Sequence, residues 1–382
     1  MTPFNRRTFL LSSMALPAAG CAPTRNARWQ KDLAGYRVRD PLAGYFDLAE
    51  RRAVMRRTRN PLLAKLRKRI ARGPRCAVVR AIPIQDQVIS MPSFYGDNKA
   101  WRQAVKPFSA FEDAVSKLAA ANLVAANRRY ADCLIATLTE WARHDALMEF
   151  HYTKDIRQGW FQVESTLFAI GLALAAVRPG ITGRAGELGY IDAWLRRVAN
   201  KHFAVPGQPG GTCCNNHYYR RALYETIIGV MTADDRMFRN GMGAIYSALS
   251  GATRDGALPL EMKRGKRAPH YQNFAVMYLA MIAEIAARQG YDMWNLEVDG
   301  KSMHSLVAFN NRILADPRVV LAYNGGKPFT LRYQKDNQYF AWFEIYLARF
   351  RNPAMEAWIA HRRPLYNRSL GGYLTAYFYR GA

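Results

Sequence analysis

The sequence predicts an all-α protein whose helices form antiparallel pairs within one large domain. Apolar residues recur at three- and four-residue steps along most of the chain, which is the pattern of amphipathic helices. The connections between these segments contain Gly, Pro, Asn and Asp, which are typical of turns. With 382 residues, of which 50% are hydrophobic, the chain is long and apolar enough to bury a substantial core.

Eight segments show the helical periodicity most clearly. In chain order they are Phe111 to Asn127, Tyr130 to Leu147, Gln162 to Val177, Leu188 to Ala199, His217 to Met231, Tyr271 to Arg288, Ser305 to Leu314 and Tyr339 to Phe350. The longest apolar run, Leu167 to Val177, is too short to cross a bilayer and suits a buried helix. Stretches typical of strands are few, and the best are Cys76 to Ile84 and Val319 to Tyr323.

The N-terminus predicts export. Arg6 and Arg7 are followed by an apolar stretch, which indicates a twin-arginine signal peptide over residues 1–20. The segment Ala18–Cys21 is typical of a lipoprotein cleavage site, so we expect a periplasmic protein attached to the outer membrane through a lipidated Cys21. A plain soluble periplasmic product is the alternative. The mature chain then begins with an arginine-rich segment, residues 21–73, for which we expect one or two peripheral helices with solvated charges.

The formal net charge of +26 predicts an anionic partner. Such a charge affects solubility and association and does not indicate a fold. Nucleic acid is the usual partner of a basic chain, but an exported protein meets little of it. Acidic exopolysaccharide is an anion that such a protein does meet. We therefore expect an anionic polysaccharide as partner, no nucleic acid, and a monomer.

Three short strings contain the residue types that one reaction needs: Asn215–His217, Arg264–Arg267 and His270–Tyr271. The C5 proton of a uronic acid is only weakly acidic while the carboxylate on C5 is charged. A cation and an amide must therefore neutralise that carboxylate and stabilise the enolate-like transition state. A base must then remove the proton while an acid protonates the departing O4. These strings predict cleavage of a polyuronate by β-elimination.

Each duty has a candidate residue. Arg264 and Asn216 suit the carboxylate, and His217 and Tyr271 are the candidates for base and acid. A free tyrosine has a pKa of roughly 10, so its use as a base requires nearby positive charge. Arg264 and the two cations that follow it, Lys266 and Arg267, would supply that charge.

Two motifs that contain these strings, Asn215–His217 and Pro259–Tyr271, together resemble the alginate lyases of polysaccharide lyase family 5. Asn-Asn-His opens a predicted helix, and Pro259–Tyr271 fits Pro-Leu-Glu-x-x-Arg-Gly-x-Arg-Ala-x-x-Tyr. The resemblance implies that residues 74–382 form an incomplete (α/α) toroid with a central substrate groove. It also implies cleavage of β-1,4-linked polymannuronate to give C4=C5 unsaturated ends. In that family the matching positions put Asn216 and Arg264 on the carboxylate, with His217 as base or neutraliser and Tyr271 as acid, base or both.

Further positions suit the walls of the groove. The segment Ser93–Asp97 resembles the mobile lid of the family, which places its tyrosine at the cleft. The predicted substrate-binding residues are Tyr95, Arg220, Arg221, Arg267 and Arg368. The chain departs from the family at Phe94, where Lys is common, and at Arg220, where Trp is common. Mannuronate and glucuronate differ only at C2, so a glucuronan or another glucuronate-containing polymer stays open as an alternative substrate.

Local helix physics supports these roles. Pro269 suits the first turn of a helix, so Tyr271 is expected near an N-terminus, where the helix dipole favours phenolate. Asn215 or Asn216 is a natural N-cap, which places His217 near another N-terminus. There the dipole disfavours imidazolium and leaves the ring able to accept a proton.

The cysteines leave two readings open, and no metal or cofactor is expected. Besides Cys21 the chain has Cys76, Cys133, Cys213 and Cys214. In an oxidising compartment a disulfide from one of the adjacent pair, Cys213 or Cys214, would staple the catalytic turn, while free buried thiols are the other reading. The histidines show no spacing typical of metal ligands.

Two functions of other classes remain as alternatives. An inverting glycoside hydrolase needs two carboxylates that flank the bond, and Asp97, Asp255 and Glu261 are available, although their spacing indicates no pair. A non-catalytic polyanion-binding lipoprotein of an exopolysaccharide system would need only the positive charge. The complete set of four catalytic candidates favours the lyase.

Overall fold

A computed structural model describes residues 27–153 and 156–381 of the chain. The predicted signal peptide and Cys21 lie outside the described residues. The α-helices are α1 (Ala27–Ala34), α2 (Leu48–Arg57), α3 (Pro61–Ile70), α4 (Cys76–Arg80), α5 (Asn98–Ala104), α6 (Lys106–Val124), α7 (Arg129–Arg143), α8 (Gln158–Val177), α9 (Ala185–Phe203), α10 (Asn216–Met231), α11 (Asp235–Gly251), α12 (Pro259–Met262), α13 (Ala268–Arg288), α14 (Met303–Ala315), α15 (Phe343–Leu347), α16 (Pro353–Ile359) and α17 (Leu374–Phe378). Short 3₁₀ helices are η2 (Arg178–Gly180), η3 (Gly265–Arg267), η4 (Pro317–Ala322), η5 (Arg332–Lys335), η6 (Asn337–Phe340) and η7 (Ala360–Arg362).

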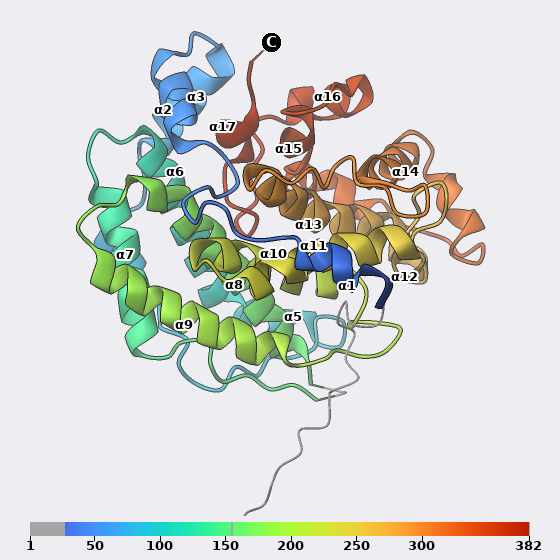
Figure 1. The fold of residues 1–382 in the computed structure, drawn as a ribbon, viewed down its shortest axis with the longest axis horizontal. Helices are drawn as coiled ribbons and strands as arrows, with labels where there is room; N and C mark the ends of the chain where they lie inside the picture. Colours follow the sequence, from blue (N-terminus) through green and yellow to red (C-terminus); the bar gives the residue numbers. More distant parts are fainter. Residues whose placement is uncertain (1–26, 154–155, 382) are drawn as a thin grey trace, which may run out of the picture.

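The helices form an incomplete (α/α) toroid, as predicted. Inner helices α6, α8, α10 and α13 contact one another in that order, and each is followed by an outer partner, α7, α9, α11 and α14. Figure 1 shows α7 and α9 along the outside of this arrangement, with α8, α10 and α13 nearer its centre. Helices α10 and α13 carry residues of the site described below in their first turns.

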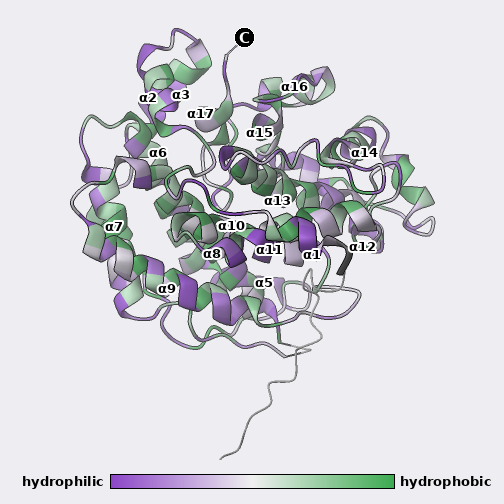
Figure 2. Ribbon diagram, viewed as in Figure 1, coloured by the Kyte–Doolittle hydropathy of each residue, from purple (hydrophilic) through white to green (hydrophobic). Residues whose placement is uncertain are grey.

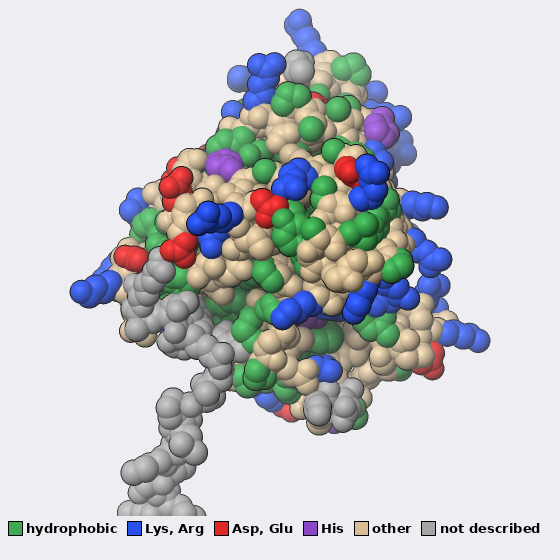
Figure 3. Space-filling model, turned by 90° about the vertical axis from the view of Figure 1, so that its right-hand side faces the viewer, with side chains coloured by type: hydrophobic (Ala, Val, Ile, Leu, Met, Phe, Trp, Pro, Cys, Tyr) green, Lys and Arg blue, Asp and Glu red, His purple; other side chains and the backbone are tan. Residues whose placement is uncertain are grey.

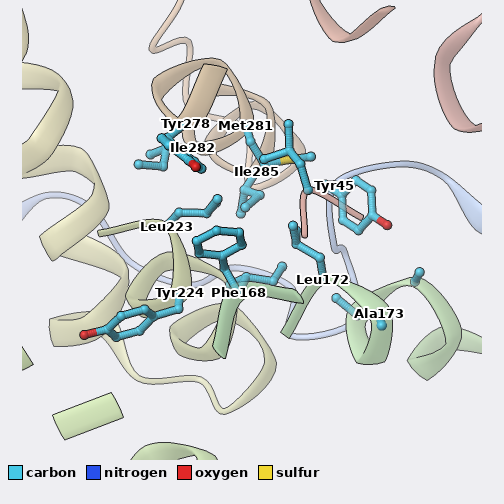
Figure 4. Packing of buried hydrophobic residues seen from close by; sticks show 14 of the residues in the cluster. Tyr45, Phe168, Leu172, Ala173, Leu223, Tyr224, Tyr278, Met281, Ile282 and Ile285 are labelled. Carbon is cyan, nitrogen blue, oxygen red and sulfur yellow. The ribbon is translucent and has the colours of Figure 1, made fainter. Parts of the chain in front are cut away.

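Burial explains why inner and outer helices differ in sequence. Nearly every residue of α8 is buried, whereas α9 buries a single stripe of six residues: Ile191, Trp194, Leu195, Val198, Ala199 and His202. Figure 2 accordingly shows hydrophobic residues concentrated on the central α13 and hydrophilic turns on the outer α9. In Figure 4, Phe168 and Leu172 of α8 pack between Leu223 of α10 and Met281 of α13.

One helix of the described chain, Gln158–Gly180, is long and apolar enough to cross a membrane. Its most apolar window is 89% buried within the protein, as expected for the core helix that the sequence predicts.

Two predicted strands are wrong. Cys76 to Ile84 begins with the short helix α4, whose Val79 is buried and whose Cys76 is joined to Cys133 of α7 by a disulfide. Val319 to Tyr323 lies mostly in η4, because Pro317 opens a helical turn and the Asp316 side chain accepts a hydrogen bond from the Arg318 amide. Short apolar runs fit strand and helix equally well, so packing decided both cases.

The basic N-terminal segment contains three helices in the described part, α1, α2 and α3, where one or two were predicted. Asp47 and Asn60 cap α2 and α3 through their side chains. Trp29, Met55 and Leu63 are buried in the same core as the toroid helices, so this segment packs directly on the ring.

Candidate active site

The start of α10 carries the Asn-Asn-His motif. The side chain of Asn215 accepts a hydrogen bond from the His217 amide at 3.0 Å and caps the helix, as the sequence predicted. The preceding residues, Cys213 and Cys214, form a disulfide with each other, which decides between the two readings of these cysteines. The turn that presents Asn216 and His217 is therefore held by a cap and by a covalent link.

Glu261 joins this motif to the second one. Its carboxylate accepts hydrogen bonds from the backbone amide of Asn216 at 2.6 Å and from Nδ2 of the same residue at 3.0 Å. Glu261 lies three positions before Arg264, so these bonds bring the two motifs together. Oδ1 of Asn216 has no protein partner in the described part of the chain. Burial raises the pKa of Glu261 to about 7, against the opposing effects of Asn216 and Arg264.

His217 lies in an aromatic and acidic setting. Its ring stacks on Phe161 at a centroid distance of 3.9 Å, and its Nδ1 is 3.1 Å from Oε2 of Glu164. Burial lowers the pKa of His217 to about 4, although the Glu164 carboxylate opposes this. The neutral ring donates Nδ1–H to Glu164, which leaves Nε2 with its lone pair. The imidazole is thus neutral, as predicted from the helix dipole, and burial is a further cause of its lowered pKa.

Glu164 is a buried carboxylate that the sequence analysis missed. Burial alone would raise its pKa, but His217, Arg220 and Arg221 together outweigh burial and lower it. The ionised side chain lies 3.2 Å from Nε of Arg220 and 3.7 Å from Nη1 of Arg221. The available signal was an acidic residue inside the apolar segment Gln162 to Val177. Buried acids in such helices need a charged partner.

Arg220 and Arg221 both contact protein groups, and their role in substrate binding stays a prediction. Arg221 is almost fully buried, lies over the Trp160 ring and donates twice to the Thr212 carbonyl at 3.1 Å. Arg220 donates to the Phe161 carbonyl at 3.1 Å and has only 9% of its side chain exposed. Because α10 is buried on all sides, residues near His217 point into the protein as readily as into the groove.

The second motif and the lid face each other across the site. The Arg264 guanidinium lies 3.8 Å from the centre of the Tyr271 ring, and the Arg267 guanidinium lies 3.9 Å from that of Tyr95. The hydroxyls of Tyr95 and Tyr271 are hydrogen-bonded, while 51% of Tyr95 is exposed. The structure thus brings Tyr95, Arg264, Arg267 and Tyr271 together, and the binding of substrate by the lid tyrosine stays a prediction.

The predicted phenolate at Tyr271 is not favoured. Tyr271 lies in the first turn of α13, where Pro269 was expected to place it. Burial raises its pKa above the usual value, and the lowering effects of Arg264 and Arg267 do not compensate. Tyr271 is therefore a protonated phenol in the free protein, which suits an acid.

Arg368 lies at another edge of the same region. Its Nε is 3.6 Å from Glu112, and 41% of its side chain is exposed. Glu112 also accepts a hydrogen bond from Nε2 of Gln162 at 2.9 Å, so α6 and α8 meet beside this arginine. The guanidinium is partly exposed, and its role in substrate binding stays a prediction.

The carboxylates considered for a hydrolase are occupied elsewhere. Asp97 caps α5, Asp255 pairs with Arg312 at 2.7 Å, and Glu261 binds Asn216. Among the described residues, no group of three or more His, Cys, Asp or Glu side chains is arranged to hold a metal.

Comparison with known proteins agrees with this geometry. Residues 62–320 match the family described as alginate lyase. The chain belongs to the alginate lyase family. It is therefore a polysaccharide lyase, a carbon–oxygen lyase, built on the toroid of that family.

Individual relatives cover most of this family member. It is 28% identical to an alginate lyase of Pseudomonas syringae pv. syringae (strain B728a) over 310 residues, which is 77% of this chain and 80% of the relative. It is 28% identical to a polysaccharide lyase of Stenotrophomonas maltophilia (strain K279a) over 286 residues, 74% and 82% of the two chains. The solved structure of alginate lyase A1-III from Sphingomonas species A1 superposes with a TM-score of 0.81 at 28% identity, covering 90% of this chain and 97% of that one.

Proposed function

We propose that this protein cleaves β-1,4-linked polymannuronate, the mannuronate-rich form of alginate, by β-elimination. One observation supports this most directly. A neutral imidazole, a buried amide, a guanidinium and a protonated phenol, from His217, Asn216, Arg264 and Tyr271, are brought together at the starts of α10 and α13. Membership of the alginate lyase family agrees with that chemistry.

Arg264 and Asn216 act on the C5 carboxylate. The guanidinium offers two parallel N–H donors, which suit a carboxylate. Nδ2 of Asn216 carries two hydrogens, one of which is bonded to Glu261, and the other serves as a donor to the same carboxylate of the substrate. Both contacts are stronger to the enolate-like state than to the ground state, so they lower the barrier to proton loss.

His217 removes the C5 proton and Tyr271 protonates O4. Nε2 of His217 is free because Nδ1 is committed to Glu164. The raised pKa of Tyr271 keeps its proton available for the leaving group. The C5–H and C4–O bonds break, a C4=C5 double bond forms, and O4 departs as a hydroxyl.

One relative solved with a tetrasaccharide supports the choice of these two residues. Complexes of alginate lyase A1-III with a tetrasaccharide exist for one variant with a histidine replaced and another with a tyrosine replaced. Those two residues are separated by the same number of positions as His217 and Tyr271.

A substrate panel tests the proposal. The protein is incubated with polymannuronate, polyguluronate, glucuronan and hyaluronan while the ultraviolet absorbance of the C4=C5 bond is followed. We expect polymannuronate to be cut fastest, because inversion at C5 in guluronate moves the proton to the other face of the sugar. A clear preference for polyguluronate would refute the one-face geometry, and a preference for glucuronan would assign the alternative substrate. New reducing ends without absorbance would indicate a hydrolase.

We also propose that the protein works in the periplasm after twin-arginine export, anchored through a lipidated Cys21. The two disulfides, Cys76–Cys133 and Cys213–Cys214, support an oxidising compartment. Cell fractionation of the parent and of Cys21→Ala tests this. The variant should move from the membrane fraction to the soluble periplasm, and equal distribution of both forms would contradict the anchor.

A further inference from the structure

One part of the surface is basic and contains no carboxylate. Residues 51–75, here called the basic hairpin, comprise most of α2, all of α3 and the turn that follows, with eleven Lys and Arg and no Asp or Glu. Eight of these cations are exposed: Arg56, Arg57, Arg59, Lys65, Lys68, Arg69, Arg72 and Arg75. The next cation, Arg80, is paired with Glu140 at 3.1 Å. None of the eight has such a partner within the described part of the chain.

The fold of the hairpin does not depend on these eight side chains. Leu63, Leu66 and Ile70 bury the inner face of α3 in the core. Of the remaining cations, Arg67 donates at 2.8 Å to two carbonyls at the end of α2, and buried Arg51 donates to the Ala376 carbonyl. The eight exposed cations are thus free to bind, while their mutual repulsion costs stability. Figure 3 views the molecule from the right-hand side of Figure 1, away from α2 and α3, and shows Lys and Arg side chains over that face as well.

The basic hairpin lies away from the catalytic residues, and the Tyr373 and Tyr366 rings lie between it and the part of the chain that carries Arg368. Arg52 donates to the carbonyl of Asn122 near the end of α6, whereas Glu112 of the site lies near its start. At 1.5 Å per residue the two levels are about 15 Å apart. The Arg69 guanidinium lies 5.7 Å from the Tyr373 ring, which contacts the ring of Tyr366, two residues before Arg368.

We propose that the basic hairpin is a second, non-catalytic binding surface for the polyuronate, reached from the cleft past Arg368. This inference rests on the proposed function. A long polyanion held at the hairpin keeps its remaining sugars at high effective concentration near the cleft. A short oligosaccharide fills the cleft without reaching the hairpin. Long chains therefore bind more tightly than short ones through contacts that do not take part in the chemistry.

The test separates hairpin binding from catalysis. In a His217→Ala background, dissociation constants for long polymannuronate and for tetramannuronate are measured in two quadruple variants. The hairpin variant combines Arg56→Gln, Arg57→Gln, Lys68→Gln and Arg72→Gln. The matched control removes four exposed cations without ion-pair partners elsewhere in the described chain: Lys31→Gln, Arg143→Gln, Arg254→Gln and Arg351→Gln. Gln has helix propensity close to Lys and Arg, so both variants should fold.

The hairpin variant should bind long polymer about tenfold more weakly at low salt and bind the tetramer within about twofold of the parent. The long-polymer difference should shrink at high salt, because exposed charges are screened. Equal weakening in the control would overturn the proposal, since net charge alone would then explain it. Unchanged polymer binding, together with lost binding to phosphatidylglycerol vesicles, would instead assign the hairpin to a membrane. A separate measurement tests the proposed function. If the parent enzyme does not cleave tetramannuronate, the proposed function fails, whatever the hairpin binds.

Discussion

The buried carboxylate of Glu164 offers a sharp test of how the site works. It accepts the Nδ1–H bond of His217 at 3.1 Å, which fixes the tautomer with a free Nε2. Glu164→Gln keeps the shape of the side chain but removes its charge and can present NH₂ to the ring. A general base typically contributes about 10²–10⁴-fold, and an unfixed tautomer loses much of that. We therefore expect kcat/KM to fall by about 10²-fold or more.

The same substitution should also lower stability. Removing one member of a buried ion pair typically costs about 3–5 kcal/mol. Here Arg220 and Arg221 keep their bonds to the carbonyls of Phe161 and Thr212, and the amide retains a dipole. We therefore expect the free energy of unfolding to fall by about 2–3 kcal/mol, measured by chemical denaturation. The variant should remain folded.

The pH profile separates positioning from mere structural support. Burial lowers the pKa of His217 to about 4, and Glu164 acts to raise it. Without Glu164 that pKa falls further, so the acid limb of kcat/KM should move to lower pH while the plateau drops. The assay is absorbance growth on polymannuronate over the pH range in which both forms stay folded. A normal plateau, or an acid limb that stays in place or moves upward, would refute the reasoning.

Three other predictions follow from the site and its surroundings. His217→Ala and Tyr271→Phe should each reduce turnover about 10²–10⁴-fold while tetramannuronate binding persists, and a near-normal rate would remove that residue from the mechanism. Arg264→Lys should have severely reduced kcat/KM although the positive charge is kept, because an ammonium lacks the planar two-donor geometry. Full activity would show that Arg264 contributes only its positive charge. Stability should fall between pH 7 and pH 4 in denaturant titrations, because the unfolded histidines bind protons that the folded ones do not; the raised pKa values of buried Glu112, Glu284 and Glu344 reduce the size of this fall. The histidines concerned are His202, His217 and His270, whose pKa values burial lowers to about 3 or 4. Burial raises the pKa values of Glu225 and Glu261 to about 7, which offsets part of this loss of stability. Higher stability at pH 4 than at pH 7 would show that the glutamates outweigh the histidines.

The helices could be predicted wherever the apolar pattern was strong. Seven of the eight predicted segments correspond to α6–α10, α13 and α14, and Tyr339 to Phe350 is shorter in the structure, as η6 and α15. Helix α11 was missed because Asp235–Gly251 contains several glycines, which weaken any local preference for helix. Its stability comes from packing on α10, which no local window shows.

The candidate site was predicted where residues lie within one motif, and less well where they meet only in space. Asn216, His217, Arg264 and Tyr271 come from two continuous strings. Glu164 comes from a different helix, so nothing near His217 in the sequence indicated it. The pKa of Tyr271 was also misjudged, because nearby cations are visible in the sequence whereas burial is not.

The positions of the first turns of α10 and α13 have an electrostatic consequence. Both helices begin at the candidate site, where each presents the equivalent of about half a positive charge. Together these two backbones contribute about one positive charge to the site, before any side chain is counted. No single substitution removes that contribution. The helix backbones thus favour anionic sugars in general, and we expect side chains such as Phe94 and Arg368 to determine which anionic sugar binds.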